Sequence, residues 1–185
     1  MKNKTKKKEE SKSRRVFRGF LLGEKVFTNS KEAFTLYETG RFGEPKEGKI
    51  YYSLIEALYL VEKNKLVVYS ARKKLDFTTL MQKAQELEKN FHTRFVVYRD
   101  MRNKGYILKT ALKFGADFRV YDKGVKPGEE HAKWILYPVH ESTGLTWHEF
   151  AAKNRVAHST RKKLLIAIVD EENDVTYYTV IWTKP

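Results

Sequence analysis

A continuous apolar run near the C-terminus, residues 164–169, limits the possible folds more than any other segment of the chain. Six successive apolar residues are typical of a strand that is covered on both faces, because a strand with one wet face alternates apolar and polar residues. A helix is predicted just before the run, where Thr146 and Glu149 form a capping-box pattern. After an acidic turn, residues 175–182 alternate like a second strand. The C-terminal part is therefore predicted to be an α/β domain with a mixed sheet.

The apolar period changes from helical to extended at about Gly105, which divides the chain into two parts. Upstream, helices are predicted after Ser53, which forms a capping-box pattern with Glu56, and after Asp76. Residues 42–48 are predicted to be a loop. We therefore expect an α+β protein with three parts: a disordered basic tail over residues 1–15, a small mixed α/β domain over 16–104, and a C-terminal domain over 105–185.

Composition supports globular domains and an intracellular location. Of the 185 residues, 41% are apolar, including 11 Phe and 11 Tyr, which is enough to build two small cores. No apolar run approaches the ~18 residues of a membrane-spanning helix, and the N-terminal lysine run lacks the apolar centre of a signal peptide. We expect a soluble, cytoplasmic protein. Because the chain has no cysteine, disulfides and thiolate metal sites are excluded.

The net charge of +14 favours a polyanionic partner, and RNA or DNA is the obvious one for an intracellular protein. Half of this charge lies within residues 1–18, where nine Lys or Arg oppose Glu9 and Glu10. Such a tail can dock on phosphates or can be an inert solvated segment, and the sequence leaves both alternatives open.

Several familiar chemistries lack their signatures. The chain has no phosphate-binding P-loop, no Gly-x-Gly-x-x-Gly fingerprint and no Gly-x-Ser-x-Gly elbow, which argues against nucleotide-fuelled, dehydrogenase and serine-hydrolase activities. The histidines are scattered without metal-ligand spacing, which argues against a zinc site. They are His92, His131, His140, His148 and His158.

Tyr121 and His131 stand at the two ends of one Gly- and Pro-containing loop, and Lys162 follows in a basic segment. Cleavage of a phosphodiester by a neighbouring 2′-hydroxyl requires a base, an acid and a positive charge near the phosphorane. A tyrosine, a histidine and a lysine can supply these three functions. On spacing alone, however, the three residues are a weak signal, and structural roles for them are the favoured interpretation.

Five longer segments carry a more specific signal, and the last three of them are distinctive motifs that composition alone does not produce. They are residues 36–43, 54–62, 97–106, 113–121 and 155–162. These segments resemble the archaeal tRNA-splicing endonuclease family, also called tRNA-intron endonucleases. With one N-terminal domain and one nuclease-like catalytic domain, the chain is similar to the short homotetrameric form.

The resemblance implies an endonuclease that excises introns from precursor tRNA at bulge–helix–bulge motifs. Neither metal nor cofactor is implied, and the products are a 2′,3′-cyclic phosphate and a 5′-hydroxyl. Tyr121 falls on the general base, His131 on the general acid and Lys162 on the lysine that stabilises the transition state. Lys163 is adjacent and chemically equivalent, and the choice of Lys162 follows from its place three residues after Ser159.

The resemblance also implies a base clamp and an assembly. Arg155 and Trp182 match the two positions whose side chains, contributed by a neighbouring subunit, clamp a flipped bulge base. The acidic turn, which on its pattern alone can be a solvated hairpin, would insert into a basic cleft of the opposing dimer, and residues 175–182 would pair two subunits of a dimer of dimers. The acidic interface candidates are Asp170, Glu171, Glu172 and Asp174.

Two other functions remain as alternatives. The chain could be a non-catalytic RNA-binding subunit of a splicing complex, although all three catalytic positions are filled. It could also be a metal-dependent nuclease that uses acids such as Asp117, Glu129 and Glu130, although these acids lack a recognisable ligand pattern.

Overall fold

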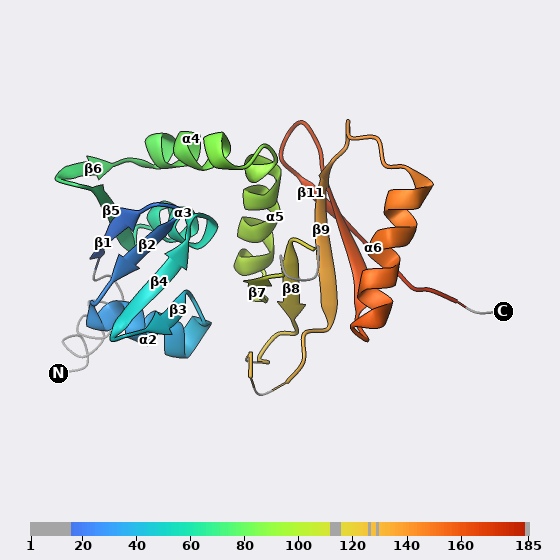
Figure 1. Ribbon diagram of the computed structural model, residues 1–185, viewed down its shortest axis with the longest axis horizontal. Coiled ribbons are helices and arrows are strands. Elements are labelled where there is room, and N and C mark those ends of the chain that lie inside the picture. Colours follow the sequence, from blue (N-terminus) through green and yellow to red (C-terminus); the bar gives the residue numbers. More distant parts are fainter. Residues whose placement is uncertain (1–15, 112–115, 126, 129, 184–185) are drawn as a thin grey trace, which may run out of the picture. The chain divides into compact units, whose positions relative to one another are not determined.

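The computed structural model describes residues 16–111, 116–125, 127–128 and 130–183 (Figure 1). The basic tail expected over residues 1–15 lies outside the described residues. Internal contacts divide the chain into two units between Lys89 and Asn90. The described residues form five helices and two mixed sheets, so the predicted α+β fold is confirmed.

The first unit is a six-stranded sheet with three helices. Its strand order is β3-β4-β2-β1-β5-β6, in which β1 and β5 are parallel and the other neighbours are antiparallel. The strands are β1 Phe17–Leu22, β2 Lys25–Thr28, β3 Glu44–Lys46, β4 Lys49–Ser53, β5 Leu66–Ser70 and β6 Lys73–Leu75. The helices are α2 Lys31–Gly40, α3 Leu54–Glu62 and α4 Phe77–Leu87.

Alternation along the strands gives this sheet one buried face. Val26, Ile50 and Val68 are fully buried, and α3 packs against β2, β4 and β5. The Ser53–Glu56 capping box predicted from sequence is confirmed, and the Glu56 carboxylate also accepts a hydrogen bond of 2.9 Å from the amide of Gly43. Helix α3 is thus fixed to the chain that enters β3.

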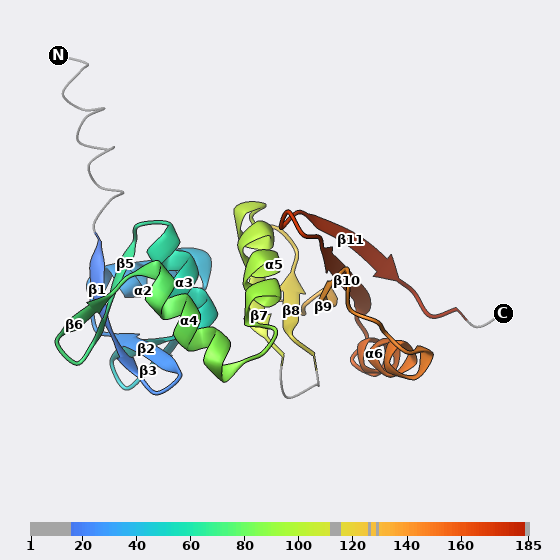
Figure 2. The same ribbon diagram turned by 90° about the horizontal axis from the view of Figure 1, so that it is seen from above.

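The second unit contains a five-stranded sheet in the order β11-β10-β9-β8-β7, with β9 and β10 parallel and the remaining pairs antiparallel. The strands are β7 Ile107–Thr110, β8 Phe118–Tyr121, β9 Trp134–His140, β10 Lys163–Val169 and β11 Val175–Val180. Helix α5 (Phe91–Asn103) and helix α6 (Trp147–Ser159) lie on opposite faces of this sheet (Figures 1 and 2).

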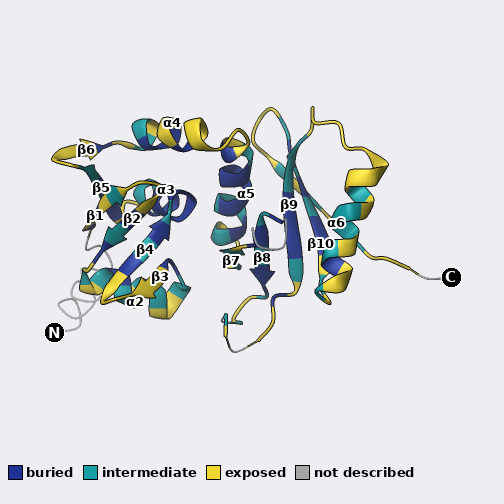
Figure 3. Cartoon of the chain, viewed as in Figure 1, coloured by how far each residue is buried: buried dark blue, intermediate teal, exposed yellow. Residues whose placement is uncertain are grey.

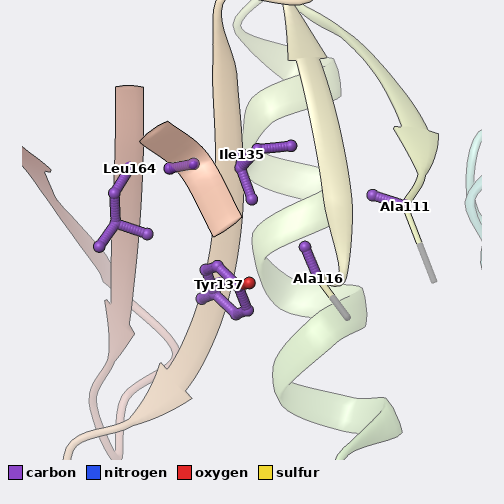
Figure 4. Packing of buried hydrophobic residues seen from close by; sticks show 6 residues of the cluster. Ala111, Ala116, Ile135, Tyr137 and Leu164 are labelled. Atoms are coloured by element: carbon purple, nitrogen blue, oxygen red, sulfur yellow. The ribbon is translucent and has the colours of Figure 1, made fainter. Parts of the chain in front are cut away.

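The central position of β10 explains its uninterrupted apolar run. Both α5 and α6 contact this strand, and Leu164, Leu165, Ala167 and Val169 are buried (Figure 3). On the α6 side, a buried cluster joins the sheet to Ala157 (Figure 4). Its other members are Ala111, Ala116, Ile135, Tyr137 and Leu164. The prediction of a strand covered on both faces is therefore confirmed.

The described chain differs from the sequence expectations in three places. Helix α5 belongs to the second unit, because it packs on β7, β9, β10 and β11, although the change of apolar period had suggested a boundary at Gly105. Residues 44–46, expected as loop, form the edge strand β3, which tolerates Pro45 and turns into β4 through Glu47 and Gly48, both with positive φ. Strand β11 ends at Val180, before Trp182.

Candidate active site

The structure brings Tyr121, His131 and Lys162 to one pocket of about 440 Å³ in the second unit. The three side chains come from the end of β8, from the loop before β9 and from the segment between α6 and β10. Strand β9 pairs with β8 on one side and with β10 on the other, and this pairing brings the three segments together. Residues far apart in the sequence therefore line one cavity.

Tyr121 is the last residue of β8, where it pairs with Ile107 of β7. Its side chain is only 5% exposed, so packing restricts its movement while the ring lines the pocket. Burial at a strand end suits a side chain that must hold one position during a reaction.

His131 is exposed and stands in the loop between β8 and β9. The base of this loop is closed twice, by a 2.9 Å hydrogen bond from the amide of Lys133 to the carbonyl of Val120 and by a 2.6 Å ion pair between Lys133 Nζ and Asp122 Oδ2. The hydrogen bond from Lys133, and then that from the Lys123 amide, holds the pKa of Asp122 below its usual value. The loop that carries His131 thus starts and ends at fixed points.

Lys162 is placed by the C-terminus of α6. Its amide donates to the carbonyl of Ala157 (2.9 Å), and the amide of Arg161 donates to the backbone carbonyl of His158 (2.9 Å). Arg161 adopts a left-handed φ of 55°. These bonds form a Schellman motif.

The Lys162 ammonium donates to the carbonyl of Thr160 at 2.8 Å, and Lys162 lines the pocket. Lys163 begins β10, is exposed and is not among the lining residues, so the structure separates the two adjacent lysines.

The pocket contains two polar residues that the sequence did not single out, Arg119 and Thr160, and it also contains Glu130, which was considered only as a metal ligand. Arg119 lies two residues before Tyr121 on β8, and that alternation places both side chains on one face of the strand. The alternating pattern of β8 was the available signal. With Arg119 and Lys162, the pocket offers two cations for an anionic group.

Arg155 and Trp182 do not line this pocket. Arg155 is exposed on α6, and Trp182, 54% exposed, follows β11. The Trp182 ring lies 4.9 Å from the ring of His158, which is three residues after Arg155 and on the same side of the helix. The two predicted clamp residues therefore lie near one exposed surface of α6, separate from the pocket lining.

The predicted acidic turn is a compact exposed hairpin. Asp170 Oδ1 accepts hydrogen bonds from the amides of Glu172 (3.0 Å) and Asp174 (2.8 Å), and Asn173 has a left-handed φ of 66°. The Asp170 carboxylate thus shapes the turn. The side chains of Glu171, Glu172 and Asp174 are exposed at the surface.

Of the three acids considered as metal ligands, the structure describes Asp117 and Glu130. Asp117 pairs with Arg94 Nε at 2.7 Å, and burial raises the pKa of its carboxyl although Arg94 opposes that effect. Glu130 lines the pocket, and Glu129 lies outside the described residues. Within the described ranges, no three His, Asp or Glu residues form a group that could hold a metal ion. Nor does any helix among the described residues have the length and apolarity to cross a membrane.

Comparisons with known proteins identify the family. The N-terminal domain of tRNA intron endonucleases matches residues 17–81, and their catalytic C-terminal domain matches residues 91–177. The chain is 42% identical over 166 residues to a tRNA-splicing endonuclease of Thermococcus kodakarensis, with 89% of this chain and 97% of the relative covered. It is 43% identical over 173 residues to that of Nanoarchaeum equitans, with 90% and 99% covered. The corresponding protein of Methanothermobacter thermautotrophicus is 36% identical over 169 residues, with 89% and 96% covered. The chain therefore belongs to the tRNA intron endonuclease family.

Proposed function

We propose that this chain is an endoribonuclease that excises introns from precursor tRNA at bulge–helix–bulge motifs. The observation that carries the proposal is the meeting of Tyr121, His131 and Lys162 in one pocket of a chain that belongs to this family. The three residues supply the base, the acid and the cation that metal-independent transesterification requires.

In the proposed reaction, Tyr121 removes the proton from the 2′-hydroxyl next to the scissile phosphate. The 2′-oxygen forms a bond to phosphorus, and Lys162 stabilises the negative charge of the phosphorane. The bond from phosphorus to the 5′-oxygen breaks while His131 gives that oxygen a proton. The products are a 2′,3′-cyclic phosphate and a 5′-hydroxyl, and Arg119 is placed to attract the substrate phosphate.

Substrate recognition would use shape and unpaired bases, because A-form RNA hides its base edges in a deep groove. Arg155 and Trp182 are exposed and can hold a flipped base by cation–π contact and stacking. Since neither lines the pocket of its own chain, a clamp supplied by a neighbouring subunit fits their placement.

Assembly as a dimer of dimers is part of the proposal. Strand β11 is an edge of its sheet and is followed by the exposed apolar residues Ile181 and Trp182, which favours pairing with another copy. The acidic side chains of the turn at 170–174 would insert into a basic surface of the opposing dimer.

Analysis of the cleavage products tests the proposed chemistry. The purified chain is incubated with a bulge–helix–bulge RNA in EDTA, and the termini are identified. Cleavage at both bulges with 2′,3′-cyclic phosphate and 5′-hydroxyl ends is expected. Cleavage that needs added Mg²⁺, or that leaves a 5′-phosphate, would favour a metal-dependent nuclease. Tight binding without cleavage would favour a non-catalytic RNA-binding subunit.

A further inference from the structure

Four aromatic side chains form a row across the sheet of the first unit. Tyr69 of β5 pairs with Phe20 of β1, Phe20 pairs with Phe27 of β2, and Phe27 pairs with Tyr51 of β4. Successive ring centroids are 6.2, 5.8 and 6.1 Å apart, with interplanar angles of 34–38°. The rings thus form a continuous surface over four neighbouring strands, which we call the aromatic row.

The aromatic row lies on the face of the sheet opposite to the core. Along β2, β4 and β5 its members alternate with the fully buried Val26, Ile50 and Val68. Phe20 is 45% exposed, and the other three rings are half-buried. The solvent-facing side of a sheet normally carries polar residues. Four adjacent rings on that side therefore indicate an interaction surface.

Cations accompany the rings. The Arg18 guanidinium lies 5.9 Å from the centroid of Tyr69, and the Lys49 ammonium lies 5.2 Å from that of Phe27. Lys74 of β6 pairs with Tyr69, and Lys25 is two residues before Phe27, so both share the face of the row. Among the strand residues on this face, the acid is Glu44, which pairs with Tyr51 at the β3 end.

We propose that the aromatic row binds unpaired RNA, with bases stacked on the rings and phosphates paired with the flanking cations. Every base presents a π-face, so aromatic rings on an open sheet hold single strands with little sequence preference. Arg18 and Lys49 lie where phosphates beside the stacked bases would pass. A second copy docked on the same face would bring like charges together, which disfavours that occupant.

This surface is independent of the cleavage pocket. Its residues belong to the first unit, whereas Tyr121, His131 and Lys162 belong to the second. It would therefore bind unpaired RNA that contains no cleavable bulge, and its test requires no catalysis.

The test compares two probes on the full-length chain by fluorescence anisotropy. One is oligouridylate of about 12 nucleotides, and the other is an abasic strand of the same length and charge. Contacts by the basic residues, including those of residues 1–18, affect both probes alike, so the ratio of the two affinities reports base stacking. Measurements are made in a Trp182→Leu background, which removes stacking by the proposed base clamp.

The paired substitution Phe20→Leu/Phe27→Leu keeps the apolar bulk and removes two π-faces. Oligouridylate affinity is expected to fall at least about tenfold while abasic affinity stays unchanged. Trp147→Leu is the matched control, because Trp147 is an exposed aromatic residue on α6, and it should change neither affinity.

Photocrosslinking on the chain with an intact aromatic row provides a readout that does not depend on how the variant folds. An oligouridylate carrying 5-iodouridine should attach to peptides from β1, β2, β4 or β5. Adducts confined to other segments, or an unchanged affinity ratio in the paired variant, would overturn the proposal. A change of assembly mass in the paired variant, measured by light scattering, would also overturn it, because the row would then be a contact between copies.

Discussion

At the scale of single residues, Asp122 and Lys133 matter because they close the loop that carries His131. Their side chains meet at 2.6 Å at the base of this loop. The hydrogen bond from Lys133 lowers the pKa of the Asp122 carboxyl, so the folded state prefers the ionised form. The resulting stabilisation is present above the ordinary aspartate pKa of about 3.9 and is lost as the pH falls through the lower folded-state pKa.

Asp122→Asn should therefore lower the melting temperature slightly at neutral pH, and the gap from the parent chain should close as the pH falls below the ordinary aspartate pKa and then through the lower folded-state pKa of Asp122. Lys133→Met should reproduce the gap, and the double variant should add little to either single change. Thermal denaturation followed by circular dichroism across this pH range measures the effect. A gap that persists unchanged in acid would show that the ion pair is not its origin.

Local sequence signals predicted the structural roles of some residues and did not reveal those of others. The capping boxes at Ser53 with Glu56 and at Thr146 with Glu149 were predictable because each motif lies within four residues. Arg119 was not singled out, because its importance depends on which strand face meets the pocket. That information comes from the pairing of β8 with its neighbours.

At the scale of secondary-structure elements, the C-terminus of α6 determines where Lys162 stands. Arg161 adopts the left-handed conformation at the position that glycine favours in a Schellman motif. The hydrogen bonds from the amides of Arg161 and Lys162 then direct the chain into the pocket and on into β10.

Arg161→Gly should preserve both the fold and cleavage, because glycine adopts this φ without steric cost. Arg161→Val should destabilise the chain by about 1 kcal/mol or more, because a β-branched residue is poorly tolerated there. The shift of the adjacent Lys162 should also reduce the single-turnover rate. Chemical denaturation and cleavage assays on both variants measure these effects, and equal rates for the two variants would contradict the proposed role of the motif.

Elements whose pattern is local were predicted more accurately than those that depend on packing. Residues 164–169 indicated a covered strand because their apolar run is uninterrupted, and β10 is that strand. Strand β3 was missed because Glu44, Pro45 and Lys46 carry no apolar alternation, and only pairing with β4 makes them extended. The unit to which α5 belongs could not be read from its own residues, since Phe95, Val96 and Met101 would be buried against either sheet.

At the scale of the whole molecule, the proposal requires one chain's pocket to work with another chain's base clamp. The edge strand β11 that would join subunits is anchored to its own unit. The hydroxyl of Tyr177 donates to Asp100 of α5 at 2.7 Å, and burial and this carboxylate raise the pKa of Tyr177. Lys104 Nζ pairs with the same carboxylate at 2.6 Å.

Mixed assemblies test this division of labour. Tyr121→Phe chains and Arg155→Ala chains should each cleave poorly alone. When the two chains are co-expressed, activity should return, because the intact pocket of an Arg155→Ala chain can then face the intact clamp of a Tyr121→Phe chain. Tyr121→Phe mixed with His131→Ala is the control, since both changes affect the pocket. Activity of the first mixture no higher than the average of its separate components would contradict a clamp supplied by a neighbouring subunit.

The most direct test of the catalytic pocket is the single-turnover cleavage rate of a bulge–helix–bulge RNA in EDTA, measured with four single variants. Tyr121→Phe, His131→Ala and Lys162→Ala should each lower the rate at least about 100-fold, with RNA affinity changed only a few-fold. Lys163→Ala, the adjacent lysine that does not line the pocket, should retain most of the rate. Full activity in the first three variants, or an equal loss in Lys163→Ala, would contradict the assignment of this pocket as the catalytic site.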